Sequence, residues 1–522
     1  MKIRLSPLHL WLPVAILFCG NAFCQQSSPM SVIGVSQSIV PVLINKKENP
    51  VIRIQIPVYS QADQVLSELT INLKGTTDIR DIKSLRLFYT GYSAQFATKN
   101  LFATAVPSDK LISFKGELKL PKGTHYLWLS AELNATADLL HYIDAEPVRL
   151  LLDGKAYTHF ADFAKSYQRI GISLRNAGDD KITSYRIPGL TTTQTGSLIA
   201  VYDIRHNSSV DLQEDVDVGM SRSVDGGKTW EPMRTIMDMG TYGNKPQDQN
   251  GIGDPSVLVD TKTGEIWVAA LWLHGYPKQR AWNASRSGLS PEETGQLMLT
   301  CSSDDGNTWS SPINITKQVK DPSWQLCFQG PGRGITMLDG TLVFPAQYKD
   351  STQLPHSTIL YSKDHGASWQ MSKAAYPNTT EAQVVETEPG TLMLNMRDNR
   401  GGSRTIYTTK DLGNTWTEHP SSRSALPEPV CNASIIKTEY NGKPVLLFVN
   451  PNAVDGRHHM TIKASLDLGL TWPVQSQLLL DELTGNGYPS LTMIDKDHIG
   501  IVYEGSQSNL VFEKIAIKEI LK

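Results

Sequence analysis

The sequence predicts an all-β protein in which a six-bladed β-propeller follows a small β-sandwich domain. Two observations carry this prediction. A short motif, Ser/Thr-x-Asp-x-Gly-x-Thr/Ser-Trp, recurs five times along the last two-thirds of the chain. Short alternating or continuous apolar runs are frequent, whereas no long run shows the 3.6-residue period of a helix. Repeated short strands that share one turn motif are typical of stacked, similar sheets.

The first 24 residues have the pattern of a secretory signal peptide. A positive start, an apolar stretch and a small-x-small cleavage site are formed by Lys2 and Arg4, residues 8–18, and Ala22-Phe23-Cys24. We therefore expect a secreted, periplasmic or cell-surface protein whose mature chain begins near Gln25. The apolar stretch is shorter than the ~20 residues that span a bilayer, and Pro13 interrupts it, so we expect no transmembrane span. Lipidation of Cys24 stays open as an alternative, although Phe23 stands where a small residue is expected.

Composition places the chain among globular proteins. It has 522 residues, 40% of them hydrophobic and 19% charged, and a formal net charge of -3. This balance provides no positive field for nucleic acid or anionic lipid, so any anion must be bound locally. After the signal peptide three cysteines remain, Cys301, Cys327 and Cys431, which are too few and too scattered for a disulfide scaffold or a zinc knuckle. We expect buried free thiols, no metal site and no cofactor.

Residues 25–165 predict a separate small β domain. They contain no copy of the repeat, but apolar residues alternate in strand fashion over residues 52–58, 69–73 and 85–89. Several short strands in about this length suit a sandwich, and the expected boundary lies in residues 162–171. A carbohydrate-binding accessory role and a purely structural role both stay open for this domain.

Residues 166–522 contain the five repeats and predict the propeller. The repeats end at tryptophans spaced 79, 60, 47 and 56 residues apart, which suits four short strands and variable loops per blade. Within each repeat, the hydroxyl and the Asp bond to a hairpin loop, Gly takes a positive φ, and Trp fills the space between sheets. Five marked blades and one unmarked blade make six. The repeats are Ser223-Asp225-Gly227-Thr229-Trp230, Ser302-Asp304-Gly306-Thr308-Trp309, Ser362-Asp364-Gly366-Ser368-Trp369, Thr409-Asp411-Gly413-Thr415-Trp416 and Ser465-Asp467-Gly469-Thr471-Trp472.

One further motif makes the prediction specific. Tyr185-Arg186-Ile187-Pro188-Gly189 precedes the first blade and, with the five Asp boxes, resembles the exo-sialidases (neuraminidases) of glycoside hydrolase family 33. The resemblance covers the chain from about Gly171 onward, and the preceding domain is similar to the accessory domain of Bacteroidetes sialidases. It implies a retaining exo-α-sialidase that hydrolyses terminal sialic acid from glycoproteins, glycolipids and oligosaccharides. A trans-sialidase and a non-catalytic sialoglycan-binding propeller are the alternatives.

The substrate explains which residues to expect. Sialic acid carries a carboxylate on its anomeric carbon, and guanidinium groups bind carboxylates in a two-donor fork that lysine lacks. The resemblance implies three converging arginines, at Arg186, at Arg397 in Asn395-Met396-Arg397-Asp398, and at Arg457 in Asp455-Gly456-Arg457-His458.

The substrate carboxylate also disfavours a carboxylate nucleophile, because two anions would meet beside the reacting carbon. Sialidases use a tyrosine instead. The matching residue is Tyr488 in Gly487-Tyr488-Pro489-Ser490-Leu491, where Pro489 is an insertion relative to the family's pattern. A phenol needs a base at its hydroxyl, and Glu381 matches that role, with Glu386 and Glu388 as its competitors.

The proton donor expected for the leaving group is Asp211, six residues after Arg205; Asp215 and Asp217 are its rivals. The resemblance implies that Asp254 contacts the substrate, that Arg205 either contacts it or supports the residues that do, and that Glu504 braces Arg186 by a charge-assisted pair. Trp272 or Trp282 is expected to supply an apolar slot for the N-acetyl methyl group. Gln329-Gly330-Pro331-Gly332-Arg333-Gly334 resembles a loop near the family's site. The expected partners are sialylated glycans, with no nucleic acid, and we expect a monomer.

Overall fold

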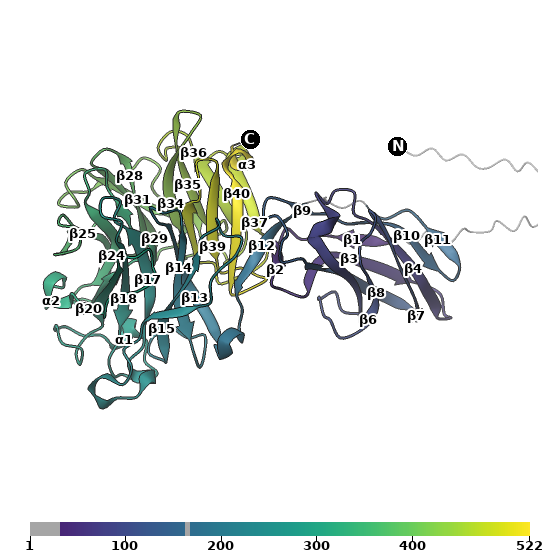
Figure 1. Ribbon diagram of the computed structural model, residues 1–522, viewed down its shortest axis with the longest axis horizontal. Coiled ribbons are helices and arrows are strands. Elements are labelled where there is room, and N and C mark those ends of the chain that lie inside the picture. Colours follow the sequence, from purple (N-terminus) through teal and green to yellow (C-terminus); the bar gives the residue numbers. More distant parts are fainter. Residues whose placement is uncertain (1–31, 162–166, 522) are drawn as a thin grey trace, which may run out of the picture.

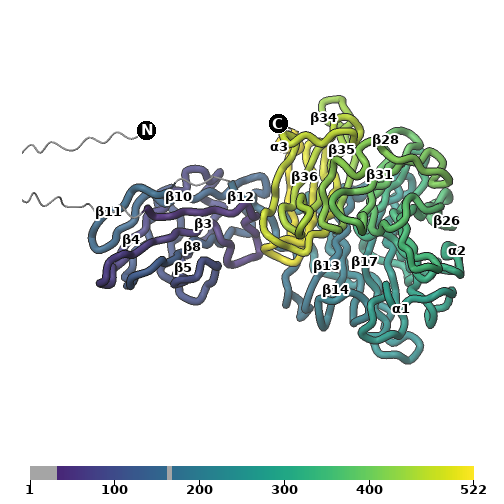
Figure 2. Tube along the Cα trace, turned by 180° about the vertical axis from the view of Figure 1, so that it is seen from behind, coloured from purple at the N-terminus to yellow at the C-terminus, as the bar shows by residue number. Residues whose placement is uncertain are grey.

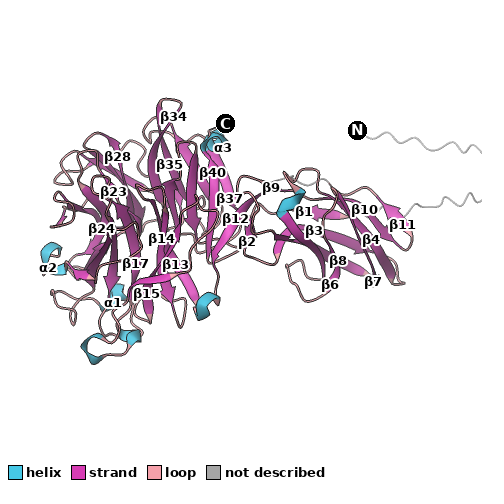
Figure 3. Cartoon of the chain, in the orientation of Figure 1, coloured by secondary structure: helices cyan, strands magenta, loops and turns pink. Residues whose placement is uncertain are grey.

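The computed structural model describes residues 32–161 and 167–521, and these residues are mainly β-strand (Figure 1). The predicted signal peptide, Cys24, and residues 162–166 of the predicted domain boundary lie outside the described residues. Cartoon colouring shows only a few short helical segments among the strands (Figure 3). The prediction of an all-β protein is therefore confirmed.

The N-terminal part has two sheets that share one buried apolar cluster, which includes Ile54, Ile71 and Leu129. The alternating segments around residues 52–58, 69–73 and 85–89 are strands, as predicted. Buried side chains recur at every second position in the first two, whereas residues 85–88 of the third are buried on both faces. In sheet order, the first sheet contains β1 (Gly34–Ser36), β3 (Asn49–Val58), β8 (Gly123–Leu133), β5 (Ile82–Gly91) and β6 (Leu101–Ala105). The second contains β11 (Lys155–Tyr157), β10 (Glu146–Leu152), β4 (Gln64–Asn72) and β7 (Leu111–Leu120).

The rest of the chain folds into a succession of larger sheets, each with its strands named from one edge to the other. The first contains β2 (Val42–Ile44), β12 (Gln168–Arg175), β40 (Leu510–Ala516), β39 (His498–Tyr503) and β38 (Pro489–Met493), with β9 (Tyr142–Ile143) at β12. The second contains β13 (Ser184–Thr192), β14 (Leu198–Arg205), β15 (Val216–Ser223) and β16 (Arg234–Met237). The third contains β20 (Ile313–Asn314), β19 (Gln296–Ser302), β18 (Ile266–Trp272), β17 (Ile252–Val259) and β22 (Gly332–Arg333).

The fourth sheet contains β21 (Leu326–Gln329), β24 (Leu342–Lys349), β25 (Pro355–Ser362) and β26 (Gln370–Met371), with β23 (Ile335–Thr336) and β27 (Tyr376–Pro377) beside them. The fifth contains β28 (Thr379–Glu388), β29 (Thr391–Asp398), β31 (Thr405–Thr409) and β32 (Thr417–Glu418). The sixth contains β34 (Ser434–Tyr440), β35 (Lys443–Pro451), β36 (Met460–Ser465) and β37 (Gln477–Asp481). A small pair, β30 (Gly402–Ser403) and β33 (Pro427–Glu428), lies beside the fifth sheet's loops.

Apolar clusters join each of these sheets to the next. Val201 and Val268 belong to one cluster between the second and third sheets, and Leu447 and Leu491 to another between the sixth and the first. Similar clusters fill the other gaps, so the sheets form a closed ring. Antiparallel pairing of β12 with β40 places the beginning and the end of this part in one sheet.

The N-terminal part is joined to the ring by a strand, which the sequence did not predict. β2 lies at residues 42–44, between β1 and β3 of the first N-terminal sheet, yet pairs in parallel with β12. Its Leu43 is fully buried in the cluster between the sixth and first sheets of the ring. The tube view shows the two parts meeting at β12 and the C-terminal strands (Figure 2).

All five repeats form the same turn. In chain order, it connects the third and fourth main strands of a sheet, for example β15 to β16 and β19 to β20. In the first, Ser223 Oγ donates to Asp225 Oδ1 at 2.9 Å and accepts from Gly227 N at 2.9 Å, while Thr229 N donates to Asp225 Oδ1 at 2.9 Å. The equivalent bonds recur in the other four repeats. The repeat glycines have φ between 79° and 92°, where a Cβ is strained.

The helices are single turns: α1 (Ala281–Ala284), α2 (Thr316–Val319), α3 (Ile517–Ile520), and 3₁₀ turns at Ile79–Asp81, Asp179–Lys181, Tyr242–Asn244, Gln247–Gln249 and Val474–Ser476. Among the described residues, no helix has the length and hydropathy needed to cross a membrane. Cys301, Cys327 and Cys431 are free thiols, but Cys301 is partly exposed, so the expectation of burial is wrong for that residue.

Candidate active site

A cavity of about 640 Å³ opens at the end of the ring where β13, β17 and β28 begin. Eight of the predicted site residues line it although the chain separates them widely: Arg186, Asp211, Asp254, Trp282, Glu381, Arg397, Arg457 and Tyr488. The antiparallel sheets place the starts of their inner strands at one end of the ring, which brings these side chains together.

A tyrosine, a glutamate and an arginine form the centre of the cavity. The hydroxyl of Tyr488 donates to Glu381 Oε1 at 2.5 Å, and Arg397 Nη1 donates to Glu381 Oε2 at 2.7 Å. Arg397 Nη1 also lies 3.0 Å from the Tyr488 hydroxyl. The phenol is therefore held directly against a base, while the guanidinium balances the carboxylate's charge.

Tyr488 is only 6% exposed and packs with Ile187 and Cys431. Burial, followed by the negative charge of Glu381, raises the pKa of Tyr488 well above its ordinary value. The phenol is consequently protonated in the free protein, so it can act as a nucleophile only if the neighbouring carboxylate takes its proton during the reaction.

Proline-containing breaks in the strands aim three of the side chains. The register shifts between Arg186 and Gly189, where Pro188 cannot donate to the ladder, and Ile187 has a φ of 57°. A similar shift accompanies Asp254-Pro255, and Asp254 has a φ of 55°. Tyr488 lies between Gly487, with a φ of 87°, and the first residue of β38.

Glu504 supports both Arg186 and the strand of Tyr488. It accepts from Arg186 Nε at 2.5 Å and Nη2 at 3.3 Å, and from the backbone N–H groups of Ile187 at 2.8 Å and Tyr488 at 3.2 Å. The predicted bracing of Arg186 by Glu504 is thus present, and the same carboxylate fixes the two strands that carry the arginine and the tyrosine.

Arg457 lines the same cavity from the loop after β35. Its Nη1 donates to the carbonyl of Asn486 at 3.0 Å, and the centre of its guanidinium lies 5.5 Å from the centroid of the Tyr488 ring. Arg186 lies 5.9 Å from the same centroid. With Arg397, three positive groups surround the tyrosine, and Arg457 forms its hydrogen bonds to the described residues with backbone carbonyls rather than with a carboxylate.

Asp211 lies at the wall of the cavity and is paired with Arg205. Arg205 Nη1 donates to Asp211 Oδ1 at 3.0 Å and to the carbonyl of Ser209 at 2.7 Å. Burial raises the pKa of Asp211, but the positive charges of Arg205, Arg186 and Arg280 outweigh it, so the pKa lies below the ordinary value. Arg205 itself is 1% exposed and is absent from the cavity wall, so it acts behind Asp211 rather than at the surface of the cavity.

Asp254 has a partner that the sequence did not identify. The buried Asp203 accepts from Arg205 Nε and Nη2 at 3.1 and 2.8 Å, and from the Asp254 N–H at 2.8 Å. Burial and the charges of Asp203 and Asp211 raise the pKa of Asp254 well above its ordinary value. The protonated acid is favoured, and it can donate a hydrogen bond into the cavity. The sequence contains a signal for Asp203, because it stands two residues before Arg205 and therefore lies on the same face of the strand.

The two predicted tryptophans have different positions. Trp282 lies in the cavity wall at α1, next to Phe328. Trp272 is 2% exposed in the core between the second and third sheets, packed edgewise on Tyr242, and it does not line the cavity. The structure therefore does not support substrate contact for Trp272, because β18 directs this side chain between sheets. Sequence reasoning missed Arg280, Asn283, Gln347, Thr380 and Asn399 in the wall.

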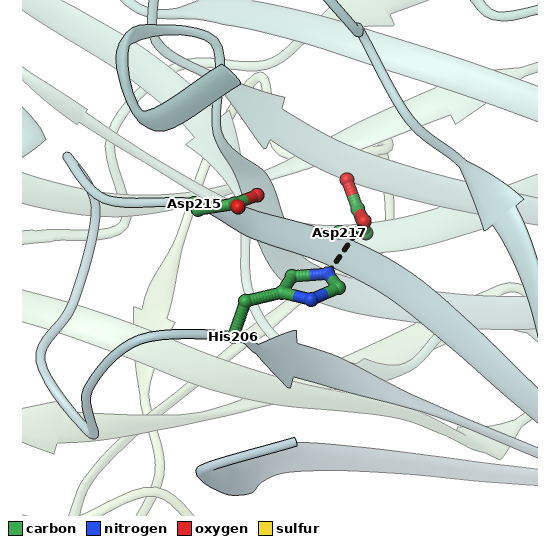
Figure 4. Close-up of side chains that lie close together, drawn as sticks. All are labelled: His206, Asp215 and Asp217. Carbon is green, nitrogen blue, oxygen red and sulfur yellow. Dashed lines mark hydrogen bonds and ion pairs between the residues drawn. The ribbon is translucent and has the colours of Figure 1, made fainter. Parts of the chain in front are cut away.

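Competitors of Glu381 and Asp211 lie elsewhere. Glu386 accepts from the N–H groups of Leu338 and Gly390, both at 2.8 Å, and lines a different cavity. Asp215 and Asp217 gather with His206, and the ligand atoms of these three lie within 4.8 Å of one another (Figure 4). His206 Nε2 and Asp217 Oδ2 form a hydrogen bond of 2.9 Å, which raises the pKa of His206.

The chain is similar to known sialidases over most of its length. Residues 187–476 match the BNR repeat-like domain, and residues 31–156 match the N-terminal domain of BNR-repeat neuraminidase. A sialidase of Bacteroides fragilis is 47% identical over 97% of this chain and 98% of its own length. A sialidase of Micromonospora viridifaciens is 31% identical over 63% of this chain and 50% of its own length. The solved structure of the Hadza microbial sialidase Hz136 is 47% identical, with a TM-score of 0.88 over 93% of this chain and 99% of that one.

Proposed function

This chain belongs to the BNR-repeat sialidase (neuraminidase) family and is an exo-α-sialidase, a glycoside hydrolase, and from this premise we propose a retaining mechanism in which Tyr488 is the nucleophile and Glu381 its base. The observation that carries the proposal is the 2.5 Å hydrogen bond from the Tyr488 hydroxyl to Glu381, inside a cavity with three arginines. We further propose that its substrates are terminal sialosides of glycoproteins, glycolipids and oligosaccharides.

Substrate binding depends on the arginines. The sialic acid carboxylate would lie between Arg186, Arg397 and Arg457, whose guanidinium groups border one cavity and can offer paired donors. Asp254, held in its protonated form, would donate to a polar substituent of the sugar, and Trp282 would contact an apolar one. Arg205 would act by positioning Asp211.

In the first step the Tyr488 oxygen forms a bond to the anomeric carbon while its proton moves to Glu381. The glycosidic C–O bond breaks, and Asp211 gives a proton to the departing oxygen. The pKa of Asp211 lies low in the free protein because of its arginine neighbours. A bound carboxylate would cancel part of that positive charge, which favours the protonated acid when substrate is present.

In the second step Asp211 takes a proton from water, whose oxygen attacks the anomeric carbon. The bond to Tyr488 breaks, and the phenolate recovers its proton from Glu381. Two displacements at one carbon return the original configuration, so the released sugar is the α-anomer. These proton transfers and displacements use only side chains of this chain and water.

We also propose that the closed ring is a six-bladed propeller with five Asp-box turns, and that residues 25–165 form an accessory sandwich beside the catalytic residues 166–522. The ring of apolar clusters and the shared turn geometry support the first part. Export by residues 1–24 and a monomeric state remain part of the proposal. N-terminal sequencing of the exported protein, with Gln25 as the expected first residue, tests the leader.

Proton NMR of a sialyllactose digest tests the function. We expect α-sialic acid to appear first and then to equilibrate to the β-anomer. The β-anomer as first product would contradict a tyrosine intermediate. Transfer of sialic acid to added lactose in preference to water would favour the trans-sialidase alternative. Binding without any release would favour a sialoglycan-binding propeller.

A further inference from the structure

A second cavity of about 600 Å³ lies at the other end of the ring. Its wall is built from strands of every sheet in the ring: β13, β17, β22, β23, β28, β34, β35 and β38. We call it the rear cavity. Its volume is in the range of small-molecule sites in proteins.

The rear cavity shares strands with the active site but not residues. β13 has Arg186 in the active site and Thr192 in the rear cavity; β28 has Glu381 in one and Glu386 in the other. Since extended chain advances about 3.3 Å per residue, each pair is at most about 20 Å apart along its strand. The two cavities are therefore separate sites at opposite ends of the same strands.

Arg333 is the unusual residue of the rear cavity. Its Nη1 donates to the carbonyl of Leu491 at 3.1 Å, and this is the one hydrogen bond that its side chain forms with the described residues. Nε is buried without a partner. A guanidinium has five N–H donors, so most of its bonding capacity is unused within the described part of the chain.

No carboxylate of the described residues balances Arg333. Arg333 forms no ion pair with the described residues, whereas Arg186, Arg205, Arg397 and Arg404 each do. Burial alone lowers the pKa of Arg333 to about 10. The two acids in the wall, Glu386 and Glu439, do not pair with Arg333. Glu386 is bonded to the backbone of Leu338 and Gly390, and Glu439 is exposed on β34. A largely buried, unpaired cation is costly, and an anionic ligand would offset that cost.

The rest of the wall suits a partly apolar ligand. Val385, Ile435, Ile436 and Met493 supply apolar surface. The hydroxyl of Thr192 is already bonded, to Thr492 Oγ1 at 3.0 Å and to the carbonyl of Met493 at 2.5 Å. The second basic residue, Lys437, donates to the carbonyl of Thr387 at 2.6 Å. Lys437 is exposed and keeps two further N–H donors in water, whereas Arg333 combines unused donors with a buried, unpartnered Nε, so an anion gains most at Arg333.

We propose that the rear cavity binds a small organic carboxylate with an apolar body, whose acid group pairs with Arg333 and whose body contacts Val385, Ile435 and Met493. The planar acid matches the guanidinium fork, and the apolar walls exclude water around the pair. This site is independent of the proposed mechanism, because none of its residues lines the active site.

Isothermal titration with 4-biphenylcarboxylate tests the proposal, with the neutral 4-biphenylcarboxamide as a matched probe. All titrations contain saturating sialic acid, which occupies the arginines of the active site. For a ligand of this size we expect one site per chain with a Kd of about 0.1 to 1 mM. The amide should bind at least about tenfold more weakly, because it brings no charge to Arg333.

Two variants locate the site. Arg333→Lys should weaken the acid by at least about fivefold through loss of the fork, with turnover of an aryl sialoside unchanged. Lys437→Gln is the control and should change the Kd by less than about twofold. Equal binding of acid and amide by the unmodified protein would overturn the proposal, even if Arg333→Lys fails to fold. Absence of acid binding in these titrations with saturating sialic acid would also overturn the proposal, as would acid binding that Arg333→Lys leaves unchanged. If the protein releases no sialic acid but still binds the carboxylate through Arg333, the proposed function is refuted and the rear-cavity proposal stands.

Discussion

The phenolic oxygen of Tyr488 lies 2.5 Å from Oε1 of Glu381, although 107 residues separate them in the chain. Arg397 donates to both groups, at 3.0 and 2.7 Å. A short bond between a buried phenol and a carboxylate prepares a proton transfer, and the arginine forms an ion pair with that carboxylate. The cluster therefore explains how a neutral side chain can attack a carbon that bears an anionic group.

Replacing Tyr488 with Phe removes the oxygen that attacks the anomeric carbon and leaves the volume of the side chain almost unchanged. We expect kcat on an aryl sialoside to fall at least about a thousand-fold, with the Tm within a few degrees of the parent. Steady-state kinetics and circular dichroism check both. A folded variant with near-parental kcat would exclude Tyr488 as nucleophile.

Asp211→Ala should separate substrates by leaving group. Sialyllactose, whose leaving alcohol needs a proton, should lose about 10² to 10⁴-fold in kcat/KM, whereas an aryl sialoside should lose at most about tenfold. The measurement compares kcat/KM for both substrates. Asp215→Ala is the matched control, because that carboxylate lies outside the cavity wall. Equal losses on both substrates would remove Asp211 from the acid role.

Single Lys variants of Arg186, Arg397 and Arg457 keep the charge but lose the fork. Loss of a charged hydrogen-bond partner here is worth about 2 to 5 kcal/mol, so kcat/KM should fall about 30-fold to several thousand-fold. Arg423→Lys would be a poor control variant for this comparison, since Arg423 pairs with Asp398, which follows Arg397 in the chain. Arg234→Lys is preferable because Arg234 pairs with Glu231 outside the cavity. Parental kinetics in the Arg457 variant would exclude that residue from the carboxylate site.

Deletion of residues 25–165 should lower the Tm of the ring and leave kcat/KM almost unchanged. The deletion removes β2 and the buried Leu43, so we expect the Tm to fall by about 5 °C or more, with kcat/KM on an aryl sialoside within about threefold. A matched truncation replaces residues 49–160 with an about ten-residue Gly/Ser linker and keeps β2. It should recover most of the Tm. An equal Tm in both truncations would show that β2 contributes little.

Glu513 makes stability depend on pH. It is fully buried, and burial raises its pKa to about 7 despite the neighbouring Arg169. Its folded pKa is above the unfolded value of ~4.3, so its contribution is complete below that value and is lost as pH rises to about 7. Glu513→Gln should flatten this decline and raise the Tm at pH 8 relative to the parent. An unchanged pH profile of Tm would show that Glu513 is not the titrating group.

Much of the fold followed from local patterns. The five repeats each encode a turn through bonds within seven residues, such as Ser223 to Gly227, and these bonds need no distant partner. Alternating segments such as Ile52 to Val58 became strands because the same alternation buries one face. β2 was not predictable, because a three-residue strand has no periodicity and its partner, β12, lies more than a hundred residues away.

The sequence by itself determined the residue types of the site, since the motifs around Arg186 and Tyr488 are contiguous in the chain. Only the tertiary structure decided which acid meets the tyrosine and which tryptophan reaches the cavity. Glu381 and Glu386 lie on one strand, but the strand spans the ring, so one meets Tyr488 and the other lies at the rear cavity. Trp272 and Trp282 differ because β18 directs Trp272 between sheets, whereas α1 places Trp282 at the opening. Such choices depend on distances between segments far apart in the chain, which local propensity does not encode.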